Sequence, residues 1–300
     1  MTNERTYPKG APCWVDTEQP DLDAARHFYA SLFGWTFSDA VPADAPGSYL
    51  IASLDGADVA AIGPARGDAP IEWNTYIAVD DADAAAASVR AAGGSITLAP
   101  VDAGPGGRLA ACVDPRGARL RLWQPRRRLG AQLTNAPGTW NFSDLHTGDP
   151  AAATGFYAPL FGWEFDDTGF ATMIRRPGYG DHLAATVDPG IRDRQEDISA
   201  PPGFADAIGW LAPLANGHDH WHVTFTVASR DESMATAERL GAVVISSDDT
   251  DWTKTALIRD PQGAELTLSQ FTPPGADDPA AGTPLSFSVS CRRLPKLTAG

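Results

Sequence analysis

Apolar and polar positions near the start of the chain follow first the period of a strand and then that of a helix. From Cys13 to Glu18 the side chains alternate, which is typical of a half-buried strand. Asp21 can cap a helix and Gly34 can end it. Between them apolar residues recur at helical spacing, at Leu22, Ala25, Phe28 or Tyr29, and Leu32. The pattern predicts a strand over 13–18 followed by a helix up to Gly34.

The next hundred residues repeat this order of strand, helix and strands. Apolar runs predict strands over 35–37, 48–54, 59–62 and 73–79, followed by an alanine-rich helix over 81–92 that stops at two glycines. Two further strands, 109–113 and 118–123, flank the sequence Asp114-Pro115-Arg116-Gly117. Proline at the second position and glycine at the fourth favour a type I turn, so these strands form a hairpin.

The whole pattern then occurs a second time. The stretch 24–37, which contains Phe-Tyr-Ala-Ser-Leu-Phe-Gly-Trp, returns at 152–165 as Phe-Tyr-Ala-Pro-Leu-Phe-Gly-Trp. The turn at 114–118 returns at 260–264, and Trp73 matches Trp221 between them. More residues separate the two copies of the turn than separate the two copies of the helix, because the second copy carries an insertion near 189–217. This insertion is rich in Pro, Gly and Asp, and we predict a long loop there.

A strand–helix–three-strand unit with these two motifs resembles the vicinal oxygen chelate superfamily of glyoxalases, bleomycin-resistance proteins and extradiol dioxygenases. The resemblance covers about 10–271 and implies an α+β fold of four βαβββ modules, which form two fused glyoxalase/bleomycin-resistance-like domains. The domains would span 10–128 and 136–273, with a C-terminal tail over 274–300. The modules could pair within a copy or across copies. One such fold serves many reactions, so it does not define the chemistry.

The resemblance also indicates where a metal would bind. Metal-dependent members present His, Gln or Glu from the first strand of each module and Glu from the last strand, all facing a concave sheet, or cup. The matching positions here are Trp14, Asn74 and Arg121 in the first copy, and Phe142, His222 and Thr267 in the second. The glutamate of the last strand of a first module would fall near Ala60 or Ala184. Tryptophan and guanidinium groups do not bind divalent cations, so we expect the first site to be metal-free. In the second copy His222 lacks the partner carboxylate on the last strand, so we expect neither a metal nor another cofactor there.

The second cup offers the candidate catalytic residues. Asp144 and His146 share a strand face with Phe142, and Thr224 shares one with His222. Asp144, His146 and His222 could act as acid and base. They could also form an improvised site for Zn or Fe, although it has few ligands. His218 and His220 flank a predicted loop, and we expect them to be solvated.

The cup faces also predict ligand-binding residues. These are Trp14, Asp16, Asn74, Tyr76, Arg121 and Trp123 in the first copy, and Phe142, Thr224, Thr267 and Ser269 in the second. Apolar walls with a few polar groups are typical of a pocket for a small molecule. An inward-facing Arg121 needs an anion, which Asp16, Glu18 or a ligand carboxylate could supply.

Composition excludes several other functions. The net charge of −15 repels polyanions, so we expect no nucleic-acid partner. No apolar run reaches the roughly 20 residues that span a bilayer, and no signal peptide is recognisable, so we expect a cytoplasmic protein. We also expect a monomer or a homodimer. The 3 cysteines fit neither a disulfide framework nor a zinc site.

Three functions remain open. The chain could bind or sequester a small organic metabolite or an antibiotic-like compound. It could instead be a metal-independent tailoring enzyme of secondary metabolism, such as a hydroxylase, isomerase or cyclase. The third hypothesis is a metal-dependent lyase or dioxygenase that uses the second cup.

In the tail, Leu285, Phe287, Val289 and Cys291 alternate with serines, a pattern typical of a strand.

Overall fold

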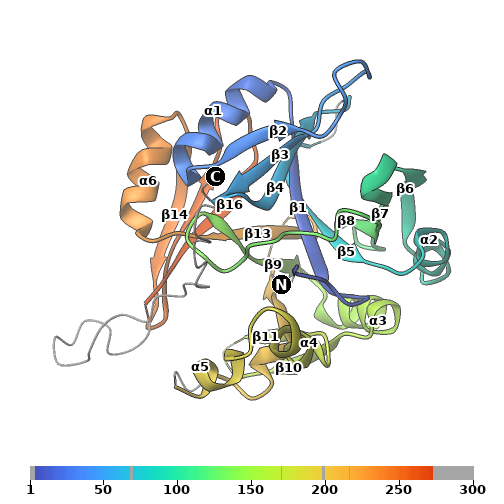
Figure 1. The fold of residues 1–300 in the computed structure, drawn as a ribbon. Helices are drawn as coiled ribbons and strands as arrows, with labels where there is room; N and C mark the ends of the chain where they lie inside the picture. The colour runs from blue at the N-terminus through green and yellow to red at the C-terminus, as the bar shows by residue number, and fades with distance from the viewer. Residues whose placement is uncertain (1–3, 68–69, 170, 198–199, 216, 273–300) are drawn as a thin grey trace, which may run out of the picture.

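Two eight-stranded sheets with the same strand order form the computed structural model, which describes residues 4–67, 70–169, 171–197, 200–215 and 217–272 (Figure 1). The first sheet has the order β2-β3-β4-β1-β5-β8-β7-β6 and the second the order β10-β11-β12-β9-β13-β16-β15-β14. The strands of the first are β1 (Pro12–Gln19), β2 (Thr36–Asp39), β3 (Leu50–Leu54), β4 (Ala57–Pro64), β5 (Trp73–Ala78), β6 (Ser95–Asp102), β7 (Gly107–Val113) and β8 (Arg119–Pro125). Those of the second are β9 (Thr139–Thr147), β10 (Glu164–Asp167), β11 (Thr172–Arg175), β12 (Ala207–Pro213), β13 (His220–Thr226), β14 (Val243–Asp249), β15 (Thr253–Arg259) and β16 (Glu265–Phe271). The α+β fold of two glyoxalase-like domains is confirmed.

Short polar side chains define the helix ends. The helices are α1 (Leu22–Phe33), α2 (Ala82–Ala91), α3 (Pro150–Phe161), α4 (Tyr179–Thr186), α5 (Ile191–Asp197) and α6 (Arg230–Arg239). Asp21 caps α1 by accepting a hydrogen bond from the backbone N–H of Ala24, and Gly34 ends it in the left-handed conformation, with φ of 76°. The helix predicted from Leu22 to Gly34 is therefore confirmed.

Each sheet contains both modules of one copy. β1 runs antiparallel to β5, with Asp16 opposite Asn74, and β9 runs antiparallel to β13, with Asp144 opposite His222. The two modules of a copy thus meet at these central strands. The pairing left open by the sequence occurs within copies.

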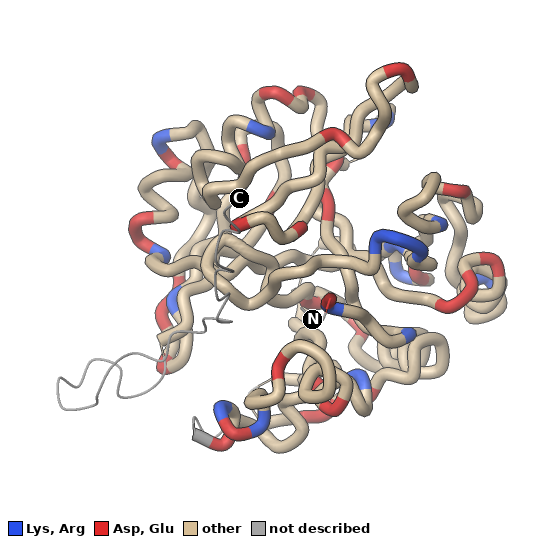
Figure 2. The backbone as a smooth tube through the Cα atoms, in the orientation of Figure 1, with Lys and Arg blue, Asp and Glu red and all other residues tan. Residues whose placement is uncertain are grey.

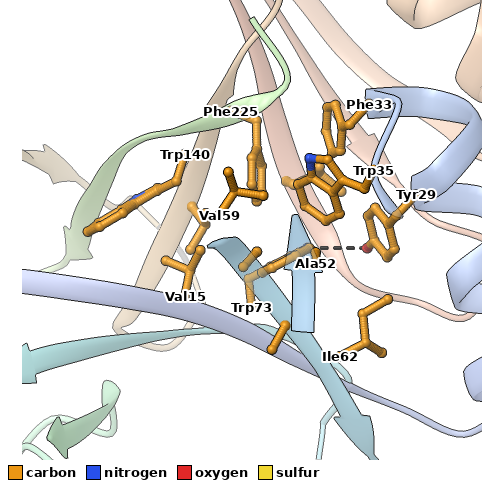
Figure 3. Packing of buried hydrophobic residues seen from close by; sticks show 14 of the residues in the cluster. Val15, Tyr29, Phe33, Trp35, Ala52, Val59, Ile62, Trp73, Trp140 and Phe225 are labelled. Carbon is orange, nitrogen blue, oxygen red and sulfur yellow. Dashed lines mark hydrogen bonds between the residues drawn. The ribbon is translucent and has the colours of Figure 1, made fainter. Parts of the chain in front are cut away.

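The hydrophobic cores, in contrast, join the copies. One cluster combines α1 and β1 to β5 with residues of β13 and the last strands, and Figure 1 shows α1 beside α6. Within it the rings of Phe33 and Phe225 lie 5.0 Å apart, with Trp35 against both (Figure 3). A second cluster combines α2, β7 and β8 with α3 and β9 to β12. Neither copy encloses a core alone.

The two repeated motifs bind each other across the copies. The Tyr29 hydroxyl donates to Oδ2 of Asp260 at 2.7 Å, and the Tyr157 hydroxyl donates to Oδ2 of Asp114 at 2.9 Å. The other oxygen of each aspartate accepts backbone N–H groups of its own turn, such as that of Ala118 at 2.9 Å. The helix motif and the turn motif are therefore partners in one contact.

The structure corrects three details of the sequence analysis. The segment 189–217 is not one long loop, because α5 and β12 lie within it. β12 pairs in parallel with β9 as β4 does with β1, so Ala184, in α4, is not the counterpart of a residue in β4. The sequence analysis also did not predict β6, because all of its positions are exposed or only partly buried and it contains no long apolar run. The tail over 274–300, with Cys291, lies outside the described residues.

Among the described residues no helix is long and apolar enough to cross a membrane. Acidic residues are spread along the backbone throughout the molecule, interspersed with basic residues (Figure 2). Cys13 and Cys112 are buried free thiols. The absence of a nucleic-acid partner stays a prediction.

We predict that Phe33→Ala and Phe161→Ala each lower the free energy of unfolding by about 3 to 5 kcal/mol, because each removes a buried ring from a core shared by the copies. Denaturant unfolding measures the loss. Val243→Ala is the control, because its side chain is 57% exposed and the change should stay within about 0.5 kcal/mol. A large loss of ligand binding at unchanged stability would contradict the structural role of the rings.

Candidate functional site

The first cup is organised around the carboxylate of Asp16, which is fully buried. Oδ2 accepts hydrogen bonds from the hydroxyl groups of Tyr49, at 2.9 Å, and Tyr76. Oδ1 accepts from the side-chain amide of Asn74 at 3.0 Å. Arg121 completes the shell, with Nη1 3.2 Å from Oδ2. Every oxygen of this buried charge is thus satisfied by the protein itself.

Arg121 finds its anions within the protein. Its Nη2 lies 2.9 Å from Oε1 of Glu18, and its guanidinium lies 5.4 Å from the ring centre of Tyr76. Burial alone would lower the pKa of Arg121, but Asp16, Tyr76 and Glu18 raise it overall, so the cation persists. A metal ion at Asp16 would face this fixed positive charge. The first cup therefore does not fit a metal.

Tryptophans complete the first cup. Nε1 of Trp14 donates to the hydroxyl of Tyr49 at 3.1 Å, and Nε1 of Trp123 donates to the carbonyl of Arg128 at 2.9 Å. Both rings are buried. The structure thus brings together all the predicted ligand-binding residues of the first cup, and they bond chiefly to one another and to the backbone. That they contact a ligand stays a prediction.

The second cup has smaller side chains at the corresponding positions. Tyr76 lies opposite Arg121 in the first sheet, and Thr224 lies opposite Thr267 in the second. Ser269 likewise takes the place of Trp123. The second cup thus lacks the guanidinium of Arg121 and the rings of Tyr76 and Trp123 but keeps an aspartate, Asp144, at the position of Asp16.

Asp144 is held by one hydrogen bond. Its Oδ1 accepts from the backbone N–H of Trp210 on β12, at 2.9 Å. β12 approaches β9 closely because Gly209 has no side chain, and a Cβ there would lie 2.2 Å from the carbonyl oxygen of Ser143. The second carboxylate oxygen has no hydrogen-bond partner among the described residues. Burial raises the pKa of Asp144 to about 7, and the Trp210 N–H offsets only part of this effect.

Three imidazoles lie beside Asp144. The ring of His146 is 5.3 Å from that of His222 and 4.8 Å from that of His220. Burial lowers the pKa of His146 to about 4 and that of His222 to about 3, and neighbouring imidazoles add to both shifts. Nε2 of His222 lies 2.8 Å from the hydroxyl of Thr267, so the two can share a hydrogen bond. His146 and His222 are therefore neutral near pH 7.

The structure places His218 and His220 and adds two aromatic residues. His220 is the first residue of β13, where the loop ends, and it is partly exposed with its ring 4.8 Å from that of His146, whereas His218 is exposed as expected. Phe204 packs 6.4 Å from Phe142 and 6.2 Å from Trp210, measured between ring centres. Phe204 and Trp210 lie in the insertion, where the predicted loop concealed them. Only the strand alternation of β12 could have indicated Trp210.

The metal site proposed from Asp144, His146 and His222 does not fit the observed arrangement. Within the described residues, no three His, Cys, Asp or Glu side chains are placed to hold an ion together. Oδ1 of Asp144 accepts from Trp210, and Nε2 of His222 is engaged by Thr267. Instead, the second cup holds the carboxyl group of Asp144, whose pKa lies near 7, beside neutral imidazoles. This arrangement suits proton transfer.

Comparisons with known proteins match both halves of the chain. Residues 19–122 match the Glyoxalase/Bleomycin resistance protein/Dioxygenase superfamily, and residues 142–269 match the Glyoxalase-like domain family. CFP32 of Mycobacterium tuberculosis, which is provisionally named a glyoxylase, is 35% identical over 280 residues, covering 91% of this chain and 99% of CFP32. The anthracycline biosynthesis protein DnrV of Streptomyces peucetius is 32% identical, covering 88% of this chain and 94% of DnrV.

Solved structures share the fold at low identity. The Mn(II)-bound glyoxalase from Novosphingobium aromaticivorans superimposes with a TM-score of 0.55 at 18% identity, covering 89% of this chain and 83% of that one. This likeness concerns the arrangement of the strands and helices alone.

We predict that Arg121→Ala lowers the free energy of unfolding by about 3 kcal/mol or more, because Asp16 would be left buried without its cation. Arg121→Lys should lose less, since it keeps the charge but not the two-point contact. Denaturant unfolding measures both. Arg126→Ala, which removes an exposed ion pair with Asp102, should leave stability nearly unchanged. Unchanged stability of Arg121→Ala would show that Asp16 does not need it.

We predict that Asp144→Asn becomes more stable relative to the natural protein as pH rises from about 4 to about 7. The folded pKa of Asp144, about 7, exceeds its unfolded value, so Asp144 contributes stability at low pH that is lost over this range. The gap could reach about 4 kcal/mol before solvent screening reduces it.

His146 and His222 act in the opposite direction, losing stability as pH falls below about 6.5, because their folded pKa values are lowered. Their effect cancels in the difference between the natural protein and Asp144→Asn. Urea unfolding at several pH values measures this difference. Asp23→Asn on exposed α1 is the control. A flat difference for Asp144→Asn would rule out the raised pKa.

Proposed function

Because the chain belongs to the glyoxalase/bleomycin resistance protein/dioxygenase superfamily, we propose that its second cup binds a small planar organic metabolite and that Asp144 acts on it as a general base, without a metal ion. The observation that carries the proposal is the carboxyl group of Asp144, with one free oxygen and a pKa of about 7. A base is most effective when its pKa lies near the working pH.

The walls of the second cup support a flat, largely apolar ligand. Phe142 and Phe204 pack near Trp210 on one side, and Thr224 and Thr267 supply hydroxyl groups on the other. The neutral imidazoles of His146 and His222 can donate or accept hydrogen bonds without bringing charge. These groups would orient a ligand oxygen while Asp144 takes the proton.

The relatives support a tailoring step in secondary metabolism. DnrV is named for anthracycline biosynthesis, and anthracyclines contain a planar fused-ring system. A proton abstraction next to a carbonyl is a step that an isomerase or a cyclase needs, and a carboxylate can supply it. We therefore propose an aromatic polyketide as the substrate class, and we assign the first cup a structural role, because its polar groups satisfy one another.

The test uses a panel of anthracyclinone-type aromatic ketones and the purified full chain, before and after chelation. Binding is measured by calorimetry and turnover by chromatography. We expect turnover that survives chelation and kcat/KM that rises with pH through about 7, since the base must be ionised. Asp144→Asn should keep binding and lose turnover, and Asp23→Asn should keep both.

Three results would contradict the proposal in different ways. Binding without turnover in the natural protein would indicate a sequestering protein. Turnover that is lost on chelation and restored by one metal would indicate a metal-dependent enzyme. Full activity of Asp144→Asn would exclude Asp144 as the base.

A further inference from the structure

A cavity of about 110 Å³ lies next to the second cup and shares Phe142 and Phe204 with it. Three parts of the chain meet there: the N-terminal segment at Arg5, the linker between the copies at Thr134, and the insertion at Tyr179 and Phe204. No described residue of the cavity wall belongs to the polar groups of the cup, namely Asp144, the imidazoles and the threonines. The cavity is thus distinct from the polar groups of the cup, and residues of β9 and β12, such as Trp140 and Ile208, line it together with these three segments.

The cavity wall contains three buried polar groups that lack hydrogen-bond partners. They are Nε of Arg5, the hydroxyl of Thr134 and the indole nitrogen of Trp140. Each can donate a hydrogen bond, and a buried donor without an acceptor costs about 1 to 3 kcal/mol. Half of the six such side-chain atoms among the described residues line this one cavity. Such a concentration of donors indicates a missing acceptor.

The charge at Arg5 specifies the kind of acceptor. No carboxylate among the described residues forms an ion pair with its guanidinium, which lies 5.6 Å from the ring centre of Tyr7. Burial alone would lower the pKa of Arg5, but the phenol oxygens of Tyr7 and Tyr179 raise it overall, so the group stays a cation. A partly buried cation with no carboxylate partner among the described residues is unfavourable, and an anion with several lone pairs would satisfy it together with the neighbouring donors.

We propose that this cavity binds a one-ring aromatic carboxylate, whose carboxylate accepts hydrogen bonds from Arg5, Thr134 and Trp140. The rings of Phe142, Tyr179 and Phe204 supply an apolar wall for the body of the ligand. The volume of about 110 Å³ is of the same order as that of an apolar protein cavity of about 150 Å³ that takes up benzene, so the ligand has no more than one ring. The site goes beyond the proton transfer proposed for Asp144 and does not depend on it.

Benzoate is the anionic probe, and benzyl alcohol is its neutral counterpart of similar shape. We expect calorimetry to show that the natural protein binds benzoate at least about 10-fold more tightly than benzyl alcohol, as a charge-assisted contact provides. Arg5→Met should remove this preference. Arg26→Met is the matched control, because Arg26 lies on the exposed face of α1 and pairs with Asp23. Equal affinity for the two probes would overturn the proposal.

Thr134→Val provides a test that does not remove a charge. The two side chains have nearly the same shape, so the variant should fold, and loss of an unpaired hydroxyl should raise the melting temperature of the free protein. The same change should weaken benzoate binding several-fold. Opposite effects on stability and affinity would support the site. A lower melting temperature with unchanged affinity would show that ordered water, not a ligand, satisfies the donors.

The test is separable from that of the proposed function. Asp144→Asn should bind benzoate as the natural protein does, because Asp144 is not part of the cavity wall. If benzoate fails to bind while Asp144→Asn still abolishes turnover, the anion site is wrong and the base assignment stands. If benzoate binds and no turnover is found, the reverse holds.

Discussion

The hydrogen bonds between the helix tyrosine of one copy and the turn aspartate of the other hold the structure together. Tyr29 with Asp260 and Tyr157 with Asp114 join residues of different copies, 231 and 43 positions apart in the chain, and each tyrosine belongs to one of the two shared cores. Each aspartate also organises its own turn through the backbone. Because the cores are closed only when the copies meet, neither sheet can fix its cup alone. The geometry of both cups therefore depends on this exchange between copies.

Because the chain is duplicated, the two cups can be compared position by position. An aspartate stands at the same position of the central strand in both, as Asp16 and Asp144. In the first cup four side chains contact the carboxylate of Asp16, and one of them, Arg121, supplies the counter-charge. In the second cup Thr267 stands at the position of Arg121, so the sheet provides no counter-charge there. Burial then raises the pKa of Asp144 to about 7. One copy can preserve the fold while the other carries a reactive group.

The sequence predicted the fold well, because its signals are local or repeated. Strand parity placed Asp144, His146 and His222 on one face, as found. It could not show which neighbours each charge would meet, since Tyr49 reaches Asp16 from the loop that ends just before β3. The insertion adds α5 and Phe204, which have no counterpart in the first copy, and it shifts β12, the counterpart of β4, along the chain, so neither β12 nor Phe204 was located by comparing the copies. The environment of Arg5 likewise depends on contacts across 127 residues, to Gln132.

The segments outside the repeat determine what differs between the two halves. The N-terminal segment is tied to the linker by paired hydrogen bonds between Arg5 and Gln132, and to α4 through His182 and Thr6. These contacts hold a cation against the second domain, whereas the cation of the first cup, Arg121, comes from the sheet itself and is neutralised there. Among the described residues, the guanidinium of Arg121 is thus paired with carboxylates in one half, whereas that of Arg5 in the other half has no carboxylate partner. Such an imbalance has a physical cost, and a site that an anion occupies in use is the arrangement in which that cost is offset.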